Sequence, residues 1–505
     1  MIETIPKLAR WYLPRLFAFE YCLAILSFVT AARLLGLHFS VVELFVDEAQ
    51  YWAWSRDLDF GYYSKPPLLA WIIAGFGLVC GSGESCIRAT SPIFYFGTAL
   101  LGYATARELY DDRVAFWAAI AIVSAPGVAF SARIASTDVP LLFFWTLALL
   151  SYVHILRGGG LRWTVTLGFA LGLGLLAKYA MIYFVIGAAI VSVIDHDSRK
   201  LLGHRNIWLA VAIAGLLIAP NVIWNALHQF DTLNHTRGLV STGSIGFKPG
   251  KGLEFIAAQF AVFGPVVFGF LLAIIFGWNN SELSREDRWM LAFSIPPLAL
   301  ITTLAFLHGS YANWAAPAFI SAAILVSAVL VREQMWTWLK IHIAFAAFVQ
   351  VVLLFGDASA DRVTASVFGQ HIDPYRRTMG WRQFASETGR IALRENAQGI
   401  IGNTRSDVAS LVYYLRDTKP RVFMWPREFD TDNYFGRTVP LTEQAGEPLL
   451  LVTDCPHETL LEKFYQNVSL VGSFDSRSGP TSFRRYFAFR LEGGKGAIHP
   501  LGKCG

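Results

Sequence analysis

The 505-residue chain has a composition that excludes an ordinary soluble protein. Hydrophobic residues make up 54 % of it and charged residues only 16 %, whereas soluble domains carry about 25 % charged residues. The net charge of +5 is spread along the chain rather than gathered into a patch, so it does not indicate nucleic-acid binding. The apolar residues fall in blocks of about 17–25, the length that crosses a bilayer. Composition therefore predicts a polytopic α-helical membrane protein.

The first apolar block is expected to be a retained span. It is too long for the hydrophobic core of a signal peptide and lacks a small-residue cleavage site. In all, the blocks predict about eleven transmembrane helices, near residues 16–37, 88–106, 114–131, 139–156, 162–177, 179–194, 207–227, 254–277, 289–307, 314–331 and 339–356. Lysine and arginine are more frequent in the short connections on the side of the N-terminus. This bias places the N-terminus in the cytoplasm and the first loop, 38–87, outside.

The first outer loop contains the stretch VDEAQYWAWSRDLDFGYYSKPPLLAW, residues 46–71. It holds two adjacent carboxylates, Asp47 and Glu48, then a dense aromatic run, and Lys65 directly before two prolines. Charges and aromatic residues beside a span suit a site that handles a charged amphipathic substrate at the bilayer surface. The alternative is an aromatic interfacial belt with snorkelling charges. Residues 66–80 are apolar but short, so we expect an interfacial helix along the outer face of the membrane.

The chain changes character near residue 357, where a soluble domain of about 150 residues begins. Segments rich in β-branched and aromatic residues alternate there with helical patterns, as in a small α/β sandwich. The expected strands are GIIGN, RVFMW, PLLLVTD, VSLVGSF and RYFAFRL, and the expected helices are 380–397, 405–417 and 457–467. We therefore divide the chain into a membrane domain, 1–356, and an outer α/β domain, 357–505, that serves as a scaffold or lid.

A second polar cluster is expected at the outer turn before the span at 139–156. Arg133 and Asp138 lie there, and an ionisable residue at the mouth of a packed bundle is a functional candidate by default. The alternative is a helix-end pair in which Asp138 caps the following helix. Lys178, between two apolar helices, either binds a lipid phosphate or snorkels.

Other polar and aromatic residues on the outer side could line a sugar or acceptor pocket. These are Tyr62, Tyr63, His235, His308 and Asn313. Such residues are also common at the membrane interface. Two D-x-D pairs, Asp57 with Asp59 and Asp430 with Asp432, are weak metal motifs that no cluster of further ligands supports. We expect neither a metal site nor a cofactor.

The five cysteines show no metal-ligand spacing. Cys80 with Cys86, and Cys455 with Cys504, could form disulfides if their segments face an oxidising compartment. For Cys80 and Cys86, unpaired thiols are the expected state.

Four motifs give the chain a family resemblance. They are DEAQYW (47–52), YYSKPPLLAW (62–71), ARIASTDVPLLFF (132–144) and LLAKY (175–179). With them, the chain resembles the C-type superfamily of membrane glycosyltransferases that use polyprenyl-phosphate sugars. This superfamily includes bacterial relatives of the protein O-mannosyltransferases, the lipid A aminoarabinose transferase and the lipid A and core galacturonosyltransferases. The resemblance covers roughly residues 16–330.

The resemblance implies a role for several of these residues. Asp47 is the catalytic carboxylate, with Glu48 its neighbour, and Asp138 is the second acidic residue of the site. Lys65 contacts the lipid phosphate. In the aminoarabinose transferase pattern a phosphate-binding arginine stands three residues after the first aspartate, where this chain has Gln50.

Because of that departure, the set of phosphate contacts is open. Arg56, Arg133 or Lys178 could replace the missing arginine. The loop SYANWAAP, residues 310–317, also differs from the aminoarabinose transferase pattern. This difference argues against the same sugar specificity.

The expected function is transfer of one sugar, with inversion, from a polyprenyl-phosphate donor to lipid A or another envelope glycolipid. The reaction is expected on the periplasmic side of a bacterial inner membrane, among membrane lipids and without nucleic acid. A protein O-mannosyltransferase is the alternative within the enzyme class. A transporter or flippase for lipid-linked sugars is the alternative outside it, although charged residues near the bilayer midplane and two repeated halves, which it requires, are not evident.

Overall fold

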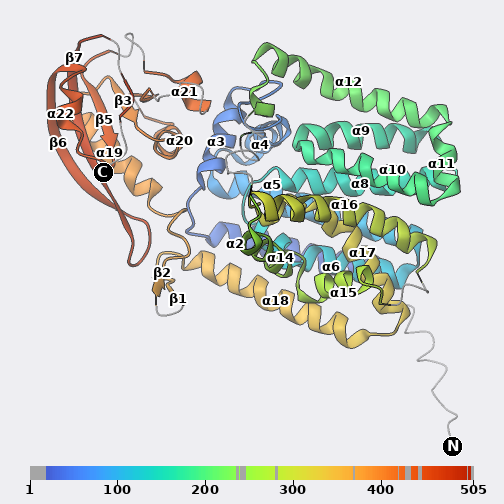
Figure 1. The fold of residues 1–505 in the computed structure, drawn as a ribbon. Coiled ribbons are helices and arrows are strands. Elements are labelled where there is room, and N and C mark those ends of the chain that lie inside the picture. The colour runs from blue at the N-terminus through green and yellow to red at the C-terminus, as the bar shows by residue number, and fades with distance from the viewer. Residues whose placement is uncertain are drawn as a thin grey trace, which may run out of the picture. The chain divides into compact units, whose positions relative to one another are not determined.

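A computed structural model describes residues 19–234, 238, 246–278, 283–367, 370–418, 420–426, 434–441, 446–496 and 499–501 (Figure 1). The chain divides into two compact units. The helical unit comprises Met1–His38, Lys65–Leu69 and Arg88–Leu354, and the α/β unit comprises Phe39–Ser64, Ala70–Ile87 and Phe355–Gly505. Most of the first outer loop thus folds together with the C-terminal residues.

The helical unit is a bundle of helices, most of them apolar. These are α2 (Phe19–Phe39), α5 (Glu84–Leu109), α6 (Asp112–Ser124), α7 (Pro126–Ser131), α8 (Asp138–Leu156), α9 (Leu161–Ala177), α10 (Ile182–Ile194), α11 (His196–Leu202), α12 (Arg205–Leu227), α14 (Pro249–Phe263), α15 (Pro265–Ile275), α16 (Arg285–Leu307), α17 (Pro317–Arg332) and α18 (Trp336–Ala358), with short 3₁₀ turns η2 (Tyr179–Met181) and η4 (Ala312–Ala315). Helix α9 packs between α8 and α12, and α17 packs against α6 and α16. Helices α8 and α17 are buried along most of their length, so they form the centre of the bundle.

Five described helices are long and apolar enough to cross a membrane: α2, α8, α12, α16 and α18. A sixth is added if helix α4 (Leu68–Cys80) and α5, which meet at a bend of 116°, count as one broken span. The prediction of a polytopic helical fold is therefore confirmed. The predicted count of eleven transmembrane helices is not confirmed, although each of the eleven predicted segments is largely helical.

Two of the predicted spans are interrupted. The 114–131 segment breaks between α6 and α7 at Pro126, which has no N–H to continue the helix. The 254–277 segment breaks between α14 and α15 at Gly264, which has φ +86° and precedes Pro265. A Cβ on Gly264 would lie 3.3 Å from Cδ of Pro126, so the two breaks pack against each other.

The C-terminal residues form the predicted α/β fold around a five-stranded sheet of order β4-β3-β5-β7-β6 (Figure 1). Strands β3 (Gly399–Gly402), β4 (Arg421–Met424) and β5 (Leu449–Thr453) are parallel, and β6 (Tyr465–Arg477) and β7 (Phe483–Gly494) add to β5 as an antiparallel hairpin. The other elements of this region are the hairpin β1 (Ala365–Val367) and β2 (Gln370–Ile372) and the helices α19 (Trp381–Arg394), α20 (Arg405–Tyr414), α21 (Tyr434–Thr438) and α22 (Glu458–Leu461).

The predicted helix at 457–467 is wrong over most of its length. Only α22 is helical there, and strand β6 begins at Tyr465. Phe464 and Tyr465 are buried in the core beneath the sheet, beside Trp425. This aromatic packing outweighs the local helical pattern.

The expectation of unpaired thiols at Cys80 and Cys86 is also wrong, because these residues form a disulfide. Helix α4 ends at Cys80, and Gly81, with φ +81°, reverses the chain. The reversal brings the two Cα atoms to 5.7 Å, which is within the range that a disulfide requires. Cys22 is free and buried. The Cys455–Cys504 pairing involves Cys504, which lies outside the described residues.

Candidate active site

The α/β unit holds Asp47 in the first turn of helix α3 (Val46–Arg56). The next residue, Glu48, is 1 % exposed, and its Oε2 accepts a hydrogen bond of 2.9 Å from the Phe45 N–H. Glu48 therefore caps the start of α3 and fixes the turn that carries Asp47. Asp47 itself keeps 42 % of its side chain exposed.

Asp47 forms an ion pair with Arg405, which is the first residue of helix α20. Nε of Arg405 also donates a hydrogen bond of 2.6 Å to Oε1 of Gln50. Sequence reasoning missed Arg405, because no local pattern links two residues that lie more than 350 positions apart. Its only sequence signal is its place at the start of a predicted helix.

An aromatic cluster supports the other end of α3. Trp54 stacks on Tyr62 at a centroid distance of 4.5 Å, and Tyr434 packs edge-on against both rings. The Tyr62 hydroxyl donates to the carbonyl of Trp54 and accepts from the Asp59 N–H, and burial raises the pKa of this phenol. Tyr62 therefore stabilises the first loop by packing and hydrogen bonding inside it. Tyr63 lies beneath the guanidinium of Arg437 at 5.3 Å.

The helical unit holds a second polar cluster, around Asp138 at the start of α8. Oδ1 of Asp138 accepts a hydrogen bond of 2.7 Å from Nζ of Lys178, and Oδ2 accepts one of 2.7 Å from Nδ2 of Asn313. The Asp138 side chain is 9 % exposed and that of Lys178 is 18 % exposed. The N-cap of α8 is Thr137, without a side-chain cap bond. Asp138 thus binds side chains rather than capping its helix.

This cluster continues into a buried amide network next to Lys178. The Tyr179 hydroxyl donates to Asn221 at 2.8 Å and accepts from Asn225 at 3.2 Å. Sequence reasoning named Asp138, Lys178 and Asn313 separately but did not predict that they meet. The three residues lie where α8 begins, where α9 ends and at η4 before α17.

The remaining predicted site residues lie at other places in the two units. Lys65 belongs to the helical unit, whereas Asp47 belongs to the α/β unit. Arg56 is exposed at the end of α3, and the guanidinium of Arg133 lies 5.1 Å from the Phe130 ring. His308 follows α16 on the same loop as Asn313. His235 lies outside the described residues.

Among the described residues, no group of three or more His, Cys, Asp or Glu side chains could hold a metal ion. Asp430 and Asp432 lie outside them.

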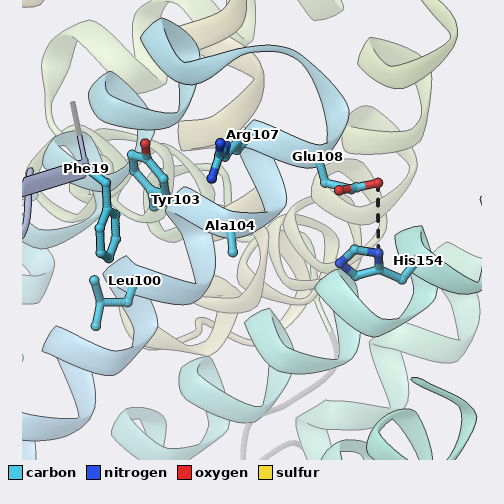
Figure 2. Close-up of a pocket in the computed structure, with 7 residues that line it drawn as sticks. All are labelled: Phe19, Leu100, Tyr103, Ala104, Arg107, Glu108 and His154. Atoms are coloured by element: carbon cyan, nitrogen blue, oxygen red, sulfur yellow. Dashed lines mark ion pairs between the residues drawn. The ribbon is translucent and has the colours of Figure 1, made fainter. Parts of the chain in front are cut away.

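A pocket of about 630 Å³ opens in the helical unit (Figure 2). It is lined by Phe19, Leu100, Tyr103, Ala104, Arg107, Glu108 and His154. Its charged side chains are paired: Glu108 lies 3.1 Å from Arg157 and 3.8 Å from His154, and Arg107 lies 2.8 Å from Asp112. His154 lies near the C-terminal end of α8, about 24 Å along the helix from Asp138. The pocket is therefore separate from the polar cluster.

Comparisons with known proteins identify the family. Residues 64–224 match the family described as dolichyl-phosphate-mannose-protein mannosyltransferase. The lipid A galacturonosyltransferase RgtD of Rhizobium johnstonii is 31 % identical over 449 residues, which cover 86 % of this chain and 92 % of RgtD. The chain belongs to the RgtD family, within the C-type superfamily of membrane glycosyltransferases.

The chain is also similar to two further proteins. The lipopolysaccharide core galacturonosyltransferase RgtA of the same organism is 28 % identical over 272 residues, which cover 51 % of this chain and 54 % of RgtA. The crystal structure of ArnT from Cupriavidus metallidurans bound to undecaprenyl phosphate matches 94 % of this chain and 98 % of ArnT with a TM-score of 0.66. Sequence identity to ArnT is 16 %, so this likeness concerns the fold alone.

Proposed function

We propose that this protein is an inverting glycosyltransferase that moves one galacturonosyl residue from a polyprenyl-phosphate donor to lipid A or a related envelope glycolipid. The observation that carries the proposal is the 31 % identity to a lipid A galacturonosyltransferase over 92 % of that enzyme. A solved structure of similar fold that binds undecaprenyl phosphate supports the donor class. The reaction takes place on the periplasmic side of the inner membrane, with the N-terminus in the cytoplasm.

In this proposal Asp47 is the general base. The acceptor hydroxyl loses its proton to the Asp47 carboxylate as its oxygen attacks the anomeric carbon of the donor. The bond from that carbon to the phosphate oxygen breaks, and its electron pair leaves with the polyprenyl phosphate. Attack from the face opposite the phosphate inverts the anomeric configuration. A positioned general base typically contributes about 10²–10⁴-fold to the rate.

Cations stabilise the departing phosphate. Lys65 and Lys178 are the proposed contacts, with Arg56 and Arg133 as further candidates. A unit charge about 4 Å from the phosphate contributes roughly 4 kcal/mol at an effective dielectric near 20, before desolvation is subtracted. Asp138 and its bond of 2.7 Å to Lys178 support a positioning role, in which Asp138 orients the ammonium. No metal ion or cofactor is part of this proposal.

A protein O-mannosyltransferase is the second candidate, because residues 64–224 match a family described by that activity. The two candidates differ in the acceptor. An assay that offers lipid A and unfolded protein to the same purified enzyme separates them, since only one acceptor becomes modified.

The proposed function is tested by mass spectrometry of envelope lipids from cells with and without this protein. We expect lipid A that carries one additional hexuronic acid residue only in cells that contain the protein. Identical lipids in the two strains would contradict the proposal, and a mass difference equal to another sugar would correct the donor.

A further inference from the structure

Arg405 brings a cation from the C-terminal region to the Asp47 carboxylate. It pairs with Asp47 and donates to Gln50, whose side chain is buried and therefore fixed in place. The Arg405 side chain is 38 % exposed and that of Asp47 is 42 % exposed. Both charged groups are thus accessible to a ligand, which distinguishes this pair from a buried structural ion pair.

Arg405 lies at the contact between helices α3 and α20. Helices α3 and α20 pack against each other, with Trp52 edge-on to Tyr413 at 5.0 Å. Asp47 and Arg405 each lie in the first turn of their helix, so the ion pair joins the two helix N-termini. The N-termini of both therefore converge at the ion pair, where their dipoles favour an additional negative charge.

The first turn of α20 is held independently of the ion pair. The Thr404 N–H donates to Oδ2 of Asp407 at 2.9 Å, and the Asp407 N–H donates back to the Thr404 hydroxyl at 3.2 Å. The Tyr414 hydroxyl also accepts from the Leu44 N–H at 3.0 Å. The Tyr414–Leu44 bond and the Trp52–Tyr413 pair hold α20 against the start of the first loop and α3, so the Arg405 guanidinium can exchange partners while the helices stay in place.

We propose that Arg405 is an anion-binding residue of the Asp47 site. On donor binding, its guanidinium exchanges the Asp47 carboxylate for an oxyanion of the donor, either the phosphate or the carboxylate of a uronic acid. A guanidinium fork matches both of these groups. The exchange leaves the Asp47 carboxylate free to accept the proton of the acceptor. This inference rests on the proposed function and adds to it a donor contact from the C-terminal region.

The test compares Arg405→Gln with Arg382→Gln, a matched control. Arg382 also joins the C-terminal region to the first loop by an exposed ion pair, with two bonds of 2.9 Å to Glu84, but it does not contact Asp47. Binding of undecaprenyl phosphate, with and without an attached galacturonic acid, is measured on the purified full-length proteins. Thermal midpoints are measured in parallel. Arg405→Lys is included as the conservative variant, because it keeps the charge but loses the fork.

We expect Arg405→Gln to weaken donor binding roughly 10-fold or more, the effect of losing a charge-assisted hydrogen bond. Arg405→Lys should recover part of the lost affinity for the donor, and Arg382→Gln should leave donor binding unchanged. Weaker binding of undecaprenyl phosphate itself assigns Arg405 to the phosphate. Weaker binding of only the galacturonic acid conjugate assigns it to the sugar carboxylate. If Arg405→Gln binds both ligands as Arg382→Gln does, the inference is wrong and Arg405 only docks α20. If the wild type binds neither ligand, the proposed function fails as well.

Discussion

At the scale of single residues, Asp138 is fixed by its neighbours. Its two oxygens accept one bond each from Lys178 and Asn313. Asp138→Ala leaves the Lys178 ammonium largely buried without its counter-charge, which typically costs about 3 kcal/mol or more. We expect a clear fall in the thermal midpoint of the purified protein. The double variant Asp138→Ala/Lys178→Met should recover part of the lost thermal midpoint. A double variant no more stable than Asp138→Ala would contradict the pairing of Asp138 with Lys178.

Asp407 is a residue whose protonation should affect stability. Its side chain is buried beside Tyr486, and burial raises the pKa of this carboxyl to about 6. Because the folded state holds the proton more tightly than the unfolded state, the contribution of Asp407 to stability is complete below about pH 4 and is lost as pH rises through about 6. This difference between the unfolded and folded pKa corresponds to roughly 3 kcal/mol of folding stability. Asp407→Asn should remove this part of the pH dependence of the thermal midpoint. An unchanged pH profile in the variant would show that Asp407 is not its source.

At the scale of elements, Glu43 connects the first loop to α19. Its buried Oε2 accepts from the backbone N–H groups of Trp381 and Arg382, at 2.5 and 3.1 Å, and so caps α19 from a distant part of the chain. We expect Glu43→Ala to lower the free energy of unfolding by about 1–2 kcal/mol. Glu447 is the control, since it also accepts two backbone N–H groups, from Gly493 and Gly494, but is exposed. Equal losses in thermal midpoint for the two alanine variants would argue against a special role of the buried cap.

The elements that could be predicted are those with a strong local signal. The apolar blocks predicted the helices, and the apolar runs around Ile400 and Leu450 predicted the central strands of the sheet. Features that depend on distant contacts could not be predicted. The core packing of Tyr465 overrode a helical pattern. The Cys80–Cys86 disulfide is local, but it depends on the backbone turn at Gly81, which the spacing of the two cysteines does not show.

The candidate site follows the same rule. Asp47 and Asp138 are candidates that their sequence motifs indicate, and their roles stay predictions. The partner of Asp47 could not be predicted, since Arg405 lies in a different part of the sequence and no local pattern marks it.

At the scale of the whole molecule, the residues named in the proposal are divided between the two compact units. Asp47 and Arg405 belong to the α/β unit, and Lys65, Asp138 and Lys178 belong to the helical unit. The first loop, which the sequence assigned to the membrane domain, folds mainly with the C-terminal residues. The C-terminal region is therefore more than a lid in this account, because it holds the helix that carries the proposed base.

Sugar transfer by purified Asp47→Asn is the most direct test of the account. Wild type and variant are given the same polyprenyl-phosphate galacturonic acid and lipid A, with the thermal midpoint and binding of undecaprenyl phosphate as controls. We predict that the wild type transfers the sugar and that the variant, still folded and still able to bind the lipid phosphate, is slower by about 10²-fold or more. Transfer by the folded variant at the wild-type rate would contradict the assignment of Asp47 as the base.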